Sequence, residues 1–176
     1  MVKFEGYEFV DGGVCAAEGF TAAGVIAGIK AGNTTKRDLA MIFCAERCKA
    51  AALYTTNKVK GAPIYVTKKH LEDGCAQAVI VNSGNANTCN ADGEEKAEAM
   101  CDLTAKELGV KPEDVLVMST GVIGQILPLE PIQAALPALL FSDLSQANFL
   151  DVWNGTFVAY CALTTIACIV ITILIS

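Results

Sequence analysis

The sequence predicts an α/β protein with a mixed sheet layered with helices. Two short apolar runs, Ala78–Val81 and Val115–Met118, each end in small polar residues and glycine. Short apolar runs bounded in this way are typical of strands buried on both faces. The segment between them, Gly93–Leu108, has the apolar period of an amphipathic helix. Strand, helix and strand in this order form a crossover unit, which would make the two strands parallel.

The segment before these elements predicts an antiparallel part of the sheet. Residues 12–30 are rich in glycine and alanine, which favours loops and short strands over a regular helix. The runs Asp38–Phe43 and Ala51–Thr56 are predicted as two strands that flank the turn AERCK, as in a hairpin. A hairpin next to a crossover unit gives a sheet with both kinds of pairing.

A third short strand is expected at Ile64–Thr67, after a loop in which proline keeps Ala62 extended. A polar helical turn is expected at 68–73. His70 lies in that turn between charged residues, so the sequence predicts a solvated surface histidine rather than a catalytic one.

The helix between the two apolar strands has recognisable ends. Asp92 is a candidate N-cap, and Glu95 stands at the third helical position of a capping box. Gly109 is a natural residue to follow the last turn. One apolar stripe is predicted to face the core: Ala97, Met100, Cys101, Thr104, Ala105 and Leu108.

Composition excludes several classes of function. The chain has 176 residues, enough for a sizeable core, and its net charge of −6 without a cluster of Lys and Arg argues against a nucleic-acid partner. Eight cysteines follow no repeating spacing, and the first residues carry no apolar signal region, so reduced thiols and a cytoplasmic location are expected. Cys44 and Cys48 are the one close pair, and His70 is the sole histidine, so no metal site is predicted.

Two similar polar segments follow the two apolar strands. Asn82–Asn87 reads NSGNAN, and Ser119–Gly124 reads STGVIG. Parallel strands would bring both segments to one edge of the sheet, where α/β proteins usually hold their ligands. Acyl transfer requires donors aimed at the oxygen that becomes negative, and the Thr120 hydroxyl and the Gly121 N–H are suitable donors at a rigid strand end.

Other chemistry at this edge is less well supported. Ser119 is not within a Gly-x-Ser-x-Gly elbow, and nothing brings the histidine to it, which argues against a serine nucleophile. The glycine spacing fits neither a P-loop nor a dinucleotide fingerprint. The residues alone therefore predict an anion-binding or oxyanion-binding edge without an evident nucleophile or base.

Four motifs in order extend this interpretation: GFTAAGVIAGIK, TTNKVKGAP, AVIVNSGNANTC and VLVMSTGVIGQILP. Over roughly residues 10 to 137 the chain closely resembles ornithine acetyltransferase, the bifunctional glutamate N-acetyltransferase of arginine biosynthesis. The resemblance implies acetyl transfer from N-acetylornithine to glutamate, with acetyl-CoA as a further donor in some members and no other cofactor. It also implies a precursor that cleaves itself before a threonine, which becomes the nucleophile of a β chain assembled with the α chain.

The resemblance assigns roles to the two polar segments. It implies that Thr120 and Gly121 form the oxyanion hole. Asn82, Ser83, Gly84 and Asn85 belong to a signature loop that either lies beside the site or holds the turn.

The resemblance ends at about residue 140, which divides the chain into an α-chain-like domain, 1–140, and a hydrophobic tail, 141–176. The family's K-G-x-G-M and A-T-M-L segments, which supply a substrate-binding lysine and the nucleophilic threonine, are not found, so a truncated chain inactive alone is expected. Residues 157–175 are uncharged and long enough for a membrane span. A tail-anchored, non-catalytic protein is thus an alternative, and a tail read from another frame of the gene is a further one.

Overall fold

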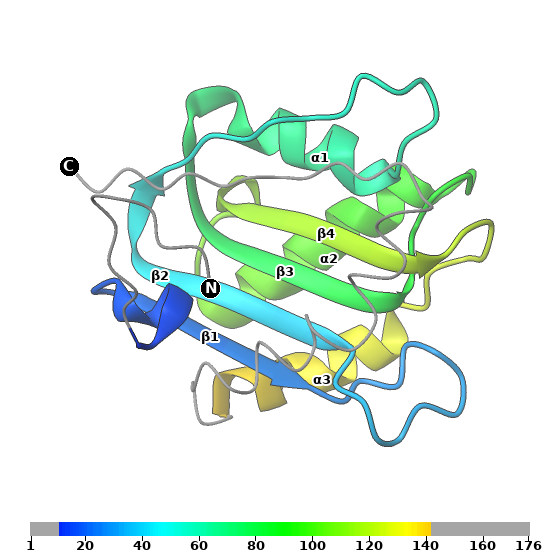
Figure 1. Cartoon of the computed structure of the whole chain (residues 1–176), viewed down its shortest axis with the longest axis horizontal. Coiled ribbons are helices and arrows are strands. Elements are labelled where there is room, and N and C mark those ends of the chain that lie inside the picture. Colours follow the sequence, from blue (N-terminus) through cyan, green and yellow to red (C-terminus); the bar gives the residue numbers. More distant parts are fainter. Residues whose placement is uncertain (1–10, 142–176) are drawn as a thin grey trace, which may run out of the picture.

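A four-stranded sheet is the centre of the computed structural model, which describes residues 11–141 (Figure 1). The strands lie in the order β1 (Phe20–Val25), β2 (Leu39–Lys49), β3 (Cys75–Asn85) and β4 (Val115–Val122). The helices are α1 (Ala62–His70), α2 (Gly93–Leu108) and α3 (Glu130–Phe141), with short 3₁₀ turns at Gly13–Ala16, Leu71–Asp73 and Pro112–Asp114. The pairs β1–β2 and β2–β3 are antiparallel, whereas β3–β4 is parallel.

The predicted crossover unit is confirmed. β3 and β4 run parallel on either side of α2 in the chain, and α2 has the predicted bounds. The apolar stripe of α2 is buried except for Leu108, which is partly buried. Gly109 ends the helix in the left-handed region with φ 72°, and its N–H donates to the carbonyl of Ala105. The apolar period of the sequence therefore located both this helix and its buried face.

The predicted capping box at the start of α2 is wrong. Asp92 stands at the N-cap, but its side chain forms no capping hydrogen bond. Its backbone, with φ −98° and ψ 13°, is not in the extended conformation from which a side chain reaches back to the first turn. Near this helix start, the side-chain amide of Asn87 donates to the carbonyl of Gly93 at 2.7 Å, and a Cβ at Gly93 would lie 2.9 Å from the Cβ of Ala62. Tight packing against α1 shapes this helix start.

The predicted hairpin after residue 38 is also wrong. The first expected strand continues through the AERCK segment as β2, and residues 51–56 form neither helix nor strand. β2 pairs with β1 as far as Cys44 and with β3 again at Cys48, and a register shift between Phe43 and Cys48 absorbs the extra residues. Because β3 supplies a partner beyond the bulge, the polar AERCK segment continues the strand and does not reverse it.

Residues expected as a short strand at 64–67 belong to helix α1. Proline occupies the first helical turn, where its missing N–H costs no intrahelical bond. The buried side chains Pro63, Val66, Thr67 and His70 follow the helical period, with Ile64 buried beside them. The β-branched residues had suggested a strand, but this segment forms a helix because the helix buries one of its faces.

Helices α2 and α3 lie on one face of the sheet, behind it in Figure 1. The core on this face joins the sheet to both helices through fully buried side chains such as Ile80, Val117, Met100 and Leu139. The opposite face carries a second buried apolar cluster: Ala76, Val79, Val81 and Leu116. The residues of β3 and β4 thus alternate between two apolar environments, which explains their continuous apolar sequence.

Helix α1 lies along the outer edge of β4. The Thr67 hydroxyl donates to the carbonyl of Val117 at 2.9 Å and accepts from its N–H at 3.3 Å. His70 Nδ1 lies 2.8 Å from the carbonyl oxygen of Val115, and Nε2 lies 2.9 Å from Glu98 of α2. The prediction of a solvated histidine is therefore wrong: His70 is 5% exposed and links α1, α2 and β4.

Within residues 11–141, none of the helices combines the length and the hydrophobicity that a membrane span requires. The uncharged run at 157–175, with the alternatives attached to it, lies outside the described residues.

Thr67→Val tests the bonds that α1 makes to the edge of β4. Valine keeps the shape but leaves the N–H and the carbonyl of Val117 without this partner, at a cost of roughly 1–3 kcal/mol for each buried group left unpaired. We expect a lower free energy of unfolding in urea, whereas Thr67→Ser keeps the hydroxyl and should recover most of it. Equal loss in both variants would mean that the methyl group, and not the hydroxyl, stabilises the edge.

Glu98→Gln tests the contribution of the ionised carboxylate beside His70. Burial raises the pKa of Glu98, but hydrogen bonds from Lys69 and His70 outweigh it and leave the pKa below its ordinary value of 4.5. A lowered pKa stabilises the fold above the unfolded-state value, and this stabilisation is lost as pH falls through the folded-state value. The stability difference between wild type and Glu98→Gln should therefore be largest at neutral pH and shrink below about pH 4.5. Asp102→Asn, which removes an exposed carboxylate from the middle of the same helix, is the control for the loss of one negative charge.

Candidate functional site

The two polar segments lie side by side at one edge of the sheet, as the sequence predicts. Ser83 is paired with Thr120, and Gly84 is paired with Gly121. Both segments were expected as turns after the strands, but the structure extends β3 to Asn85 and β4 to Val122. The candidate residues are therefore held by strand pairing.

Gly121 makes the closest backbone approach at this edge. A Cβ atom at Gly121 would lie 2.3 Å from the carbonyl carbon of Gly84 and 2.5 Å from the N of Asn85. Its φ of 137° is also in the region that favours glycine. The register shifts here, so that Asn85 faces both Thr120 and Val122. A side chain at Gly121 would force the two strand ends apart.

Asparagine side chains fix the segments that follow the strands. The side-chain amide of Asn82 donates to the backbone carbonyl of Asn85 at 2.9 Å, and the side-chain Oδ1 of Asn85 accepts from the N–H of Asn87 at 2.8 Å. The Asn85 amide donates to the carbonyls of Gln125 and Ile126 at 3.0 and 3.1 Å. Asn82 and Asn85 therefore use their amides to hold the backbone around the edge.

The candidate hydroxyls lie on opposite faces of the sheet. By strand alternation Thr120 and Ser83 share the face of Leu116, while Ser119 and Asn82 share the face covered by α2 and α3. The Ser119 Oγ and Asn82 Oδ1 atoms are buried and have no hydrogen-bond partner among the described residues. Ser119 therefore points away from the side on which Thr120 lies.

The N–H of Gly121 is directed away from β3. Thr67 bonds both backbone groups of Val117 on the α1 side, and the carbonyl of Val122 accepts from Ala86 on the β3 side. Since peptide groups alternate along a strand, the N–H of Gly121 points to the α1 side. This N–H thus lies on the side of β4 that faces α1, and it belongs to the residue that directly follows Thr120.

A loop to which the sequence analysis gave no role packs against this edge. Lys30, between β1 and β2, is exposed, and its Cβ lies 3.2 Å from the position that a Cβ at Gly84 would take. The loop is anchored by the buried carboxylate of Asp38, which accepts from the N–H groups of Ala27 and Ile29 at 2.6 and 2.9 Å. The one available sequence signal was an acidic residue directly before an apolar strand.

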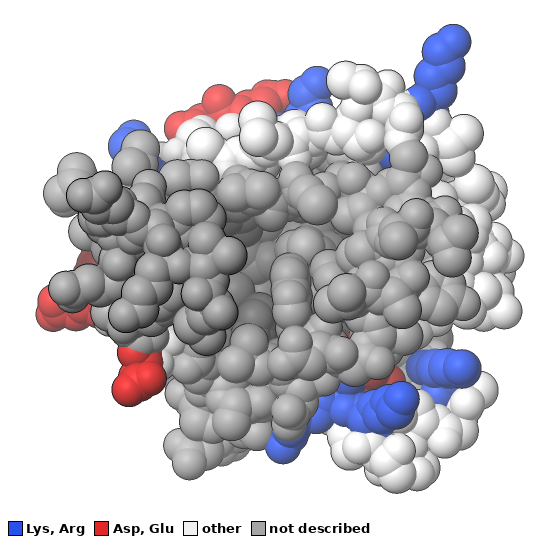
Figure 2. All heavy atoms as spheres, in the orientation of Figure 1, with Lys and Arg blue, Asp and Glu red and all other residues white. Residues whose placement is uncertain are grey.

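Basic side chains collect around the same loop. Lys30, Lys36 and Arg37 lie between β1 and β2, and Figure 2 shows blue side chains at that end of the molecule and acidic groups mainly at the other. A local positive charge in a chain of net charge −6 favours an anionic ligand at this edge. Among the described residues no group of three or more His, Cys, Asp or Glu is arranged to hold a metal ion.

Comparison with solved structures shows which class of protein this fold belongs to. The α/β arrangement matches a crystal structure of an arginine biosynthesis bifunctional protein from Bacillus halodurans, with a TM-score of 0.66 and 39% identity over 70% of this chain and 64% of that one. Ornithine acetyltransferase from Mycobacterium tuberculosis, solved with ornithine, gives a TM-score of 0.72 and 33% identity over 79% of this chain and 77% of that one.

The ArgJ family model matches residues 21–165, and the chain belongs to this family. The arginine biosynthesis bifunctional protein ArgJ 1 of Clostridium acetobutylicum is 48% identical over 133 residues, or 73% of this chain. That match covers 32% of the relative, so the chain spans about one third of the length of the curated relatives it matches. The family match also extends past residue 140, where the resemblance seen in the sequence ended.

Gly121→Ala tests the close approach of the two strand ends. We expect it to destabilise the fold by more than Gly124→Ala, because Gly124 also has positive φ (77°) but has open space around it. Gly124→Ala should cost about 1–3 kcal/mol of backbone strain, and Gly121→Ala should add the clash with Gly84. Urea unfolding of both variants measures the difference, and equal losses would rule out the close approach as a constraint.

Proposed function

We propose that this chain supplies the oxyanion-binding side of a site that transfers acetyl from N-acetylornithine to glutamate. The observation that carries the proposal is the close approach of Gly121 to Gly84 at the carboxyl ends of β3 and β4. Strand alternation then directs the N–H of Gly121 away from β3. Thr120 provides a hydroxyl from the adjacent position. These two donors would stabilise the negative oxygen of the tetrahedral intermediate that forms in acyl transfer.

The charge around the edge supports carboxylate substrates. N-acetylornithine and glutamate both carry carboxylates, and Lys30 lies beside Gly84 on a loop that the Asp38 carboxylate fixes. A cation on a fixed loop binds a carboxylate at a smaller entropic cost than one on a mobile loop. Lys30 is therefore our candidate for positioning a substrate carboxylate.

The attacking group would come from outside the described residues. His70 is occupied by Val115 and Glu98 at the other end of α1, and Ser119 is buried on the face opposite Thr120. Neither is placed to act as base or nucleophile at Gly121. This supports a nucleophilic threonine on a partner β chain, as the family resemblance implies, with this chain inactive alone.

Thr120→Ala tests the proposed oxyanion donor. The assay measures acetyl transfer from N-acetylornithine to glutamate by the chain combined with the C-terminal part of the Clostridium acetobutylicum relative. Losing one donor should lower kcat by about 10²–10³, or roughly 2.7–4 kcal/mol, with KM nearly unchanged.

Thr120→Ser keeps the hydroxyl and is the matched control, so it should retain most of the activity. A kcat unchanged in Thr120→Ala would remove Thr120 from the site. A wild-type assembly that transfers no acetyl group would contradict the proposed function.

A further inference from the structure

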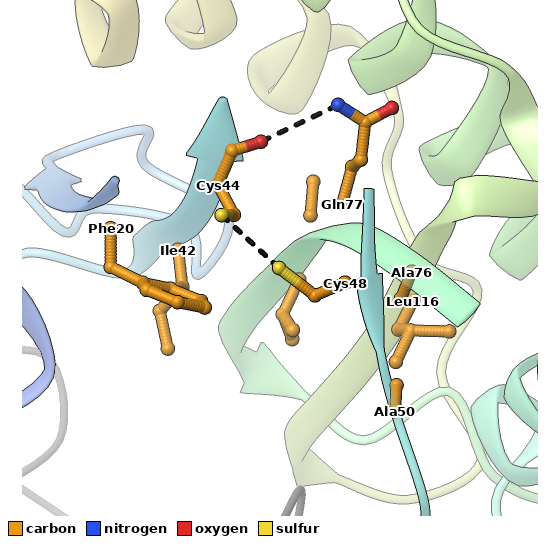
Figure 3. A pocket seen from close by; sticks show the side chains of 10 residues that line it. Phe20, Ile42, Cys44, Cys48, Ala50, Ala76, Gln77 and Leu116 are labelled. Atoms are coloured by element: carbon orange, nitrogen blue, oxygen red, sulfur yellow. Dashed lines mark hydrogen bonds between the residues drawn. The ribbon is translucent and has the colours of Figure 1, made fainter. Parts of the chain in front are cut away.

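Two thiols meet at the bulge of β2, at the end of the sheet remote from the candidate site. The Sγ atoms of Cys44 and Cys48 lie 3.2 Å apart, and both cysteines are free (Figure 3). Cys44 is buried at 5% exposure, whereas Cys48 is partly exposed. A disulfide bond is about 2.05 Å long, so a small side-chain movement would bring the two sulfurs to bonding distance.

The bulge creates this juxtaposition. Cys44 is paired with Phe20 of β1, and Cys48 is paired with Ala76 of β3 after the register shift. In a regular strand, residues four apart lie far beyond the reach of a disulfide. The extra residues of the bulge fold the strand back enough to place both sulfurs on the same side.

A small cavity borders both sulfurs. Its volume is about 30 Å³, and it is lined mainly by apolar side chains from Phe20, Ile42, Val79 and Leu116 together with the two cysteines (Figure 3). A cavity of this size admits a molecule of the size of water. A hydroperoxide such as hydrogen peroxide is only slightly larger, so it can approach the thiols from this side.

We propose that Cys44 and Cys48 form a dithiol modification site that a hydroperoxide converts to an intrachain disulfide. The Cys48 thiolate attacks one peroxide oxygen, the O–O bond breaks, and Cys48 becomes a sulfenic acid as hydroxide leaves and takes a proton. The Cys44 sulfur then attacks the Cys48 sulfur and displaces water. The two cysteines lose two electrons and two protons, and hydrogen peroxide is reduced to two molecules of water.

The surroundings of Cys48 set the pH dependence of the first step. Burial, the hydrogen bond with Cys44 and the nearby Glu46 and Cys75 raise the pKa of Cys48 to about 11. The Lys49 ammonium lies 3.8 Å from the Cys75 sulfur. Since only the thiolate reacts, the rate of disulfide formation should rise nearly tenfold per pH unit between pH 7 and 9.

Peptide mapping tests the proposal on the full chain. The reduced protein is treated with hydrogen peroxide, free thiols are alkylated, and the protein is cleaved with trypsin. Because trypsin cuts after Arg37, Arg47 and Lys49, the two cysteines fall on separate peptides, DLAMIFCAER and CK. We expect these peptides joined by one disulfide in the folded protein and mixed pairings when oxidation is carried out in urea.

Matched variants separate this pair from the other thiols. Cys44→Ser and Cys48→Ser should each abolish the linked peptide, whereas Cys89→Ser, which removes an exposed cysteine elsewhere, should leave it unchanged. The exposed Cys89 shows whether the peroxide has acted. If Cys89 is oxidised in the folded protein while the CK peptide is still recovered with an alkylated Cys48, the proposal is overturned. A linkage of either cysteine to Cys75 would overturn it as well.

Discussion

The contact between Gly121 and Gly84 is the constraint on which the candidate site depends. Two parallel strands normally keep room for side chains at every position, but here a single Cβ would collide with the neighbouring backbone. The contact requires glycine at Gly121, shifts the register at Asn85 and keeps the last residues of β4 within the sheet. The amides of Asn82 and Asn85 then hold the segments that follow the two strands through hydrogen bonds to backbone carbonyls.

The sequence predicted those parts of the fold that depend on local periodicity. The apolar runs and the period of α2 determine the parallel pair, because each buries a face that its own residues define. The hairpin and the strand at 64–67 failed for a non-local reason. β3 offered the polar part of β2 a partner, and the edge of β4 offered α1 hydrogen-bond partners, neither of which is evident from the segments themselves.

The candidate site, like the fold, could be predicted from the sequence only where the signal is local. Thr120 and Gly121 could be singled out because a strand followed by small polar residues is a local signal, and the register confirms that they meet the NSGNAN segment. Lys30 and Asp38 could not, because their place beside Gly84 depends on how the loop between β1 and β2 folds back. His70 appeared solvated from its charged neighbours, although the helical face it shares with Thr67 buries it.

Helix α1 also protects the sheet. An edge strand with free N–H and carbonyl groups can pair with a strand of another chain, which leads to aggregation. Thr67 and His70 occupy those groups at Val115 and Val117, so the first part of the β4 edge is closed to such pairing. Within residues 11–141, the side-chain hydrogen bonds from α1 to β4 reach Val115 and Val117 but not Gly121. The position proposed to bind an oxyanion is thus also one at which an extended peptide could add to the sheet.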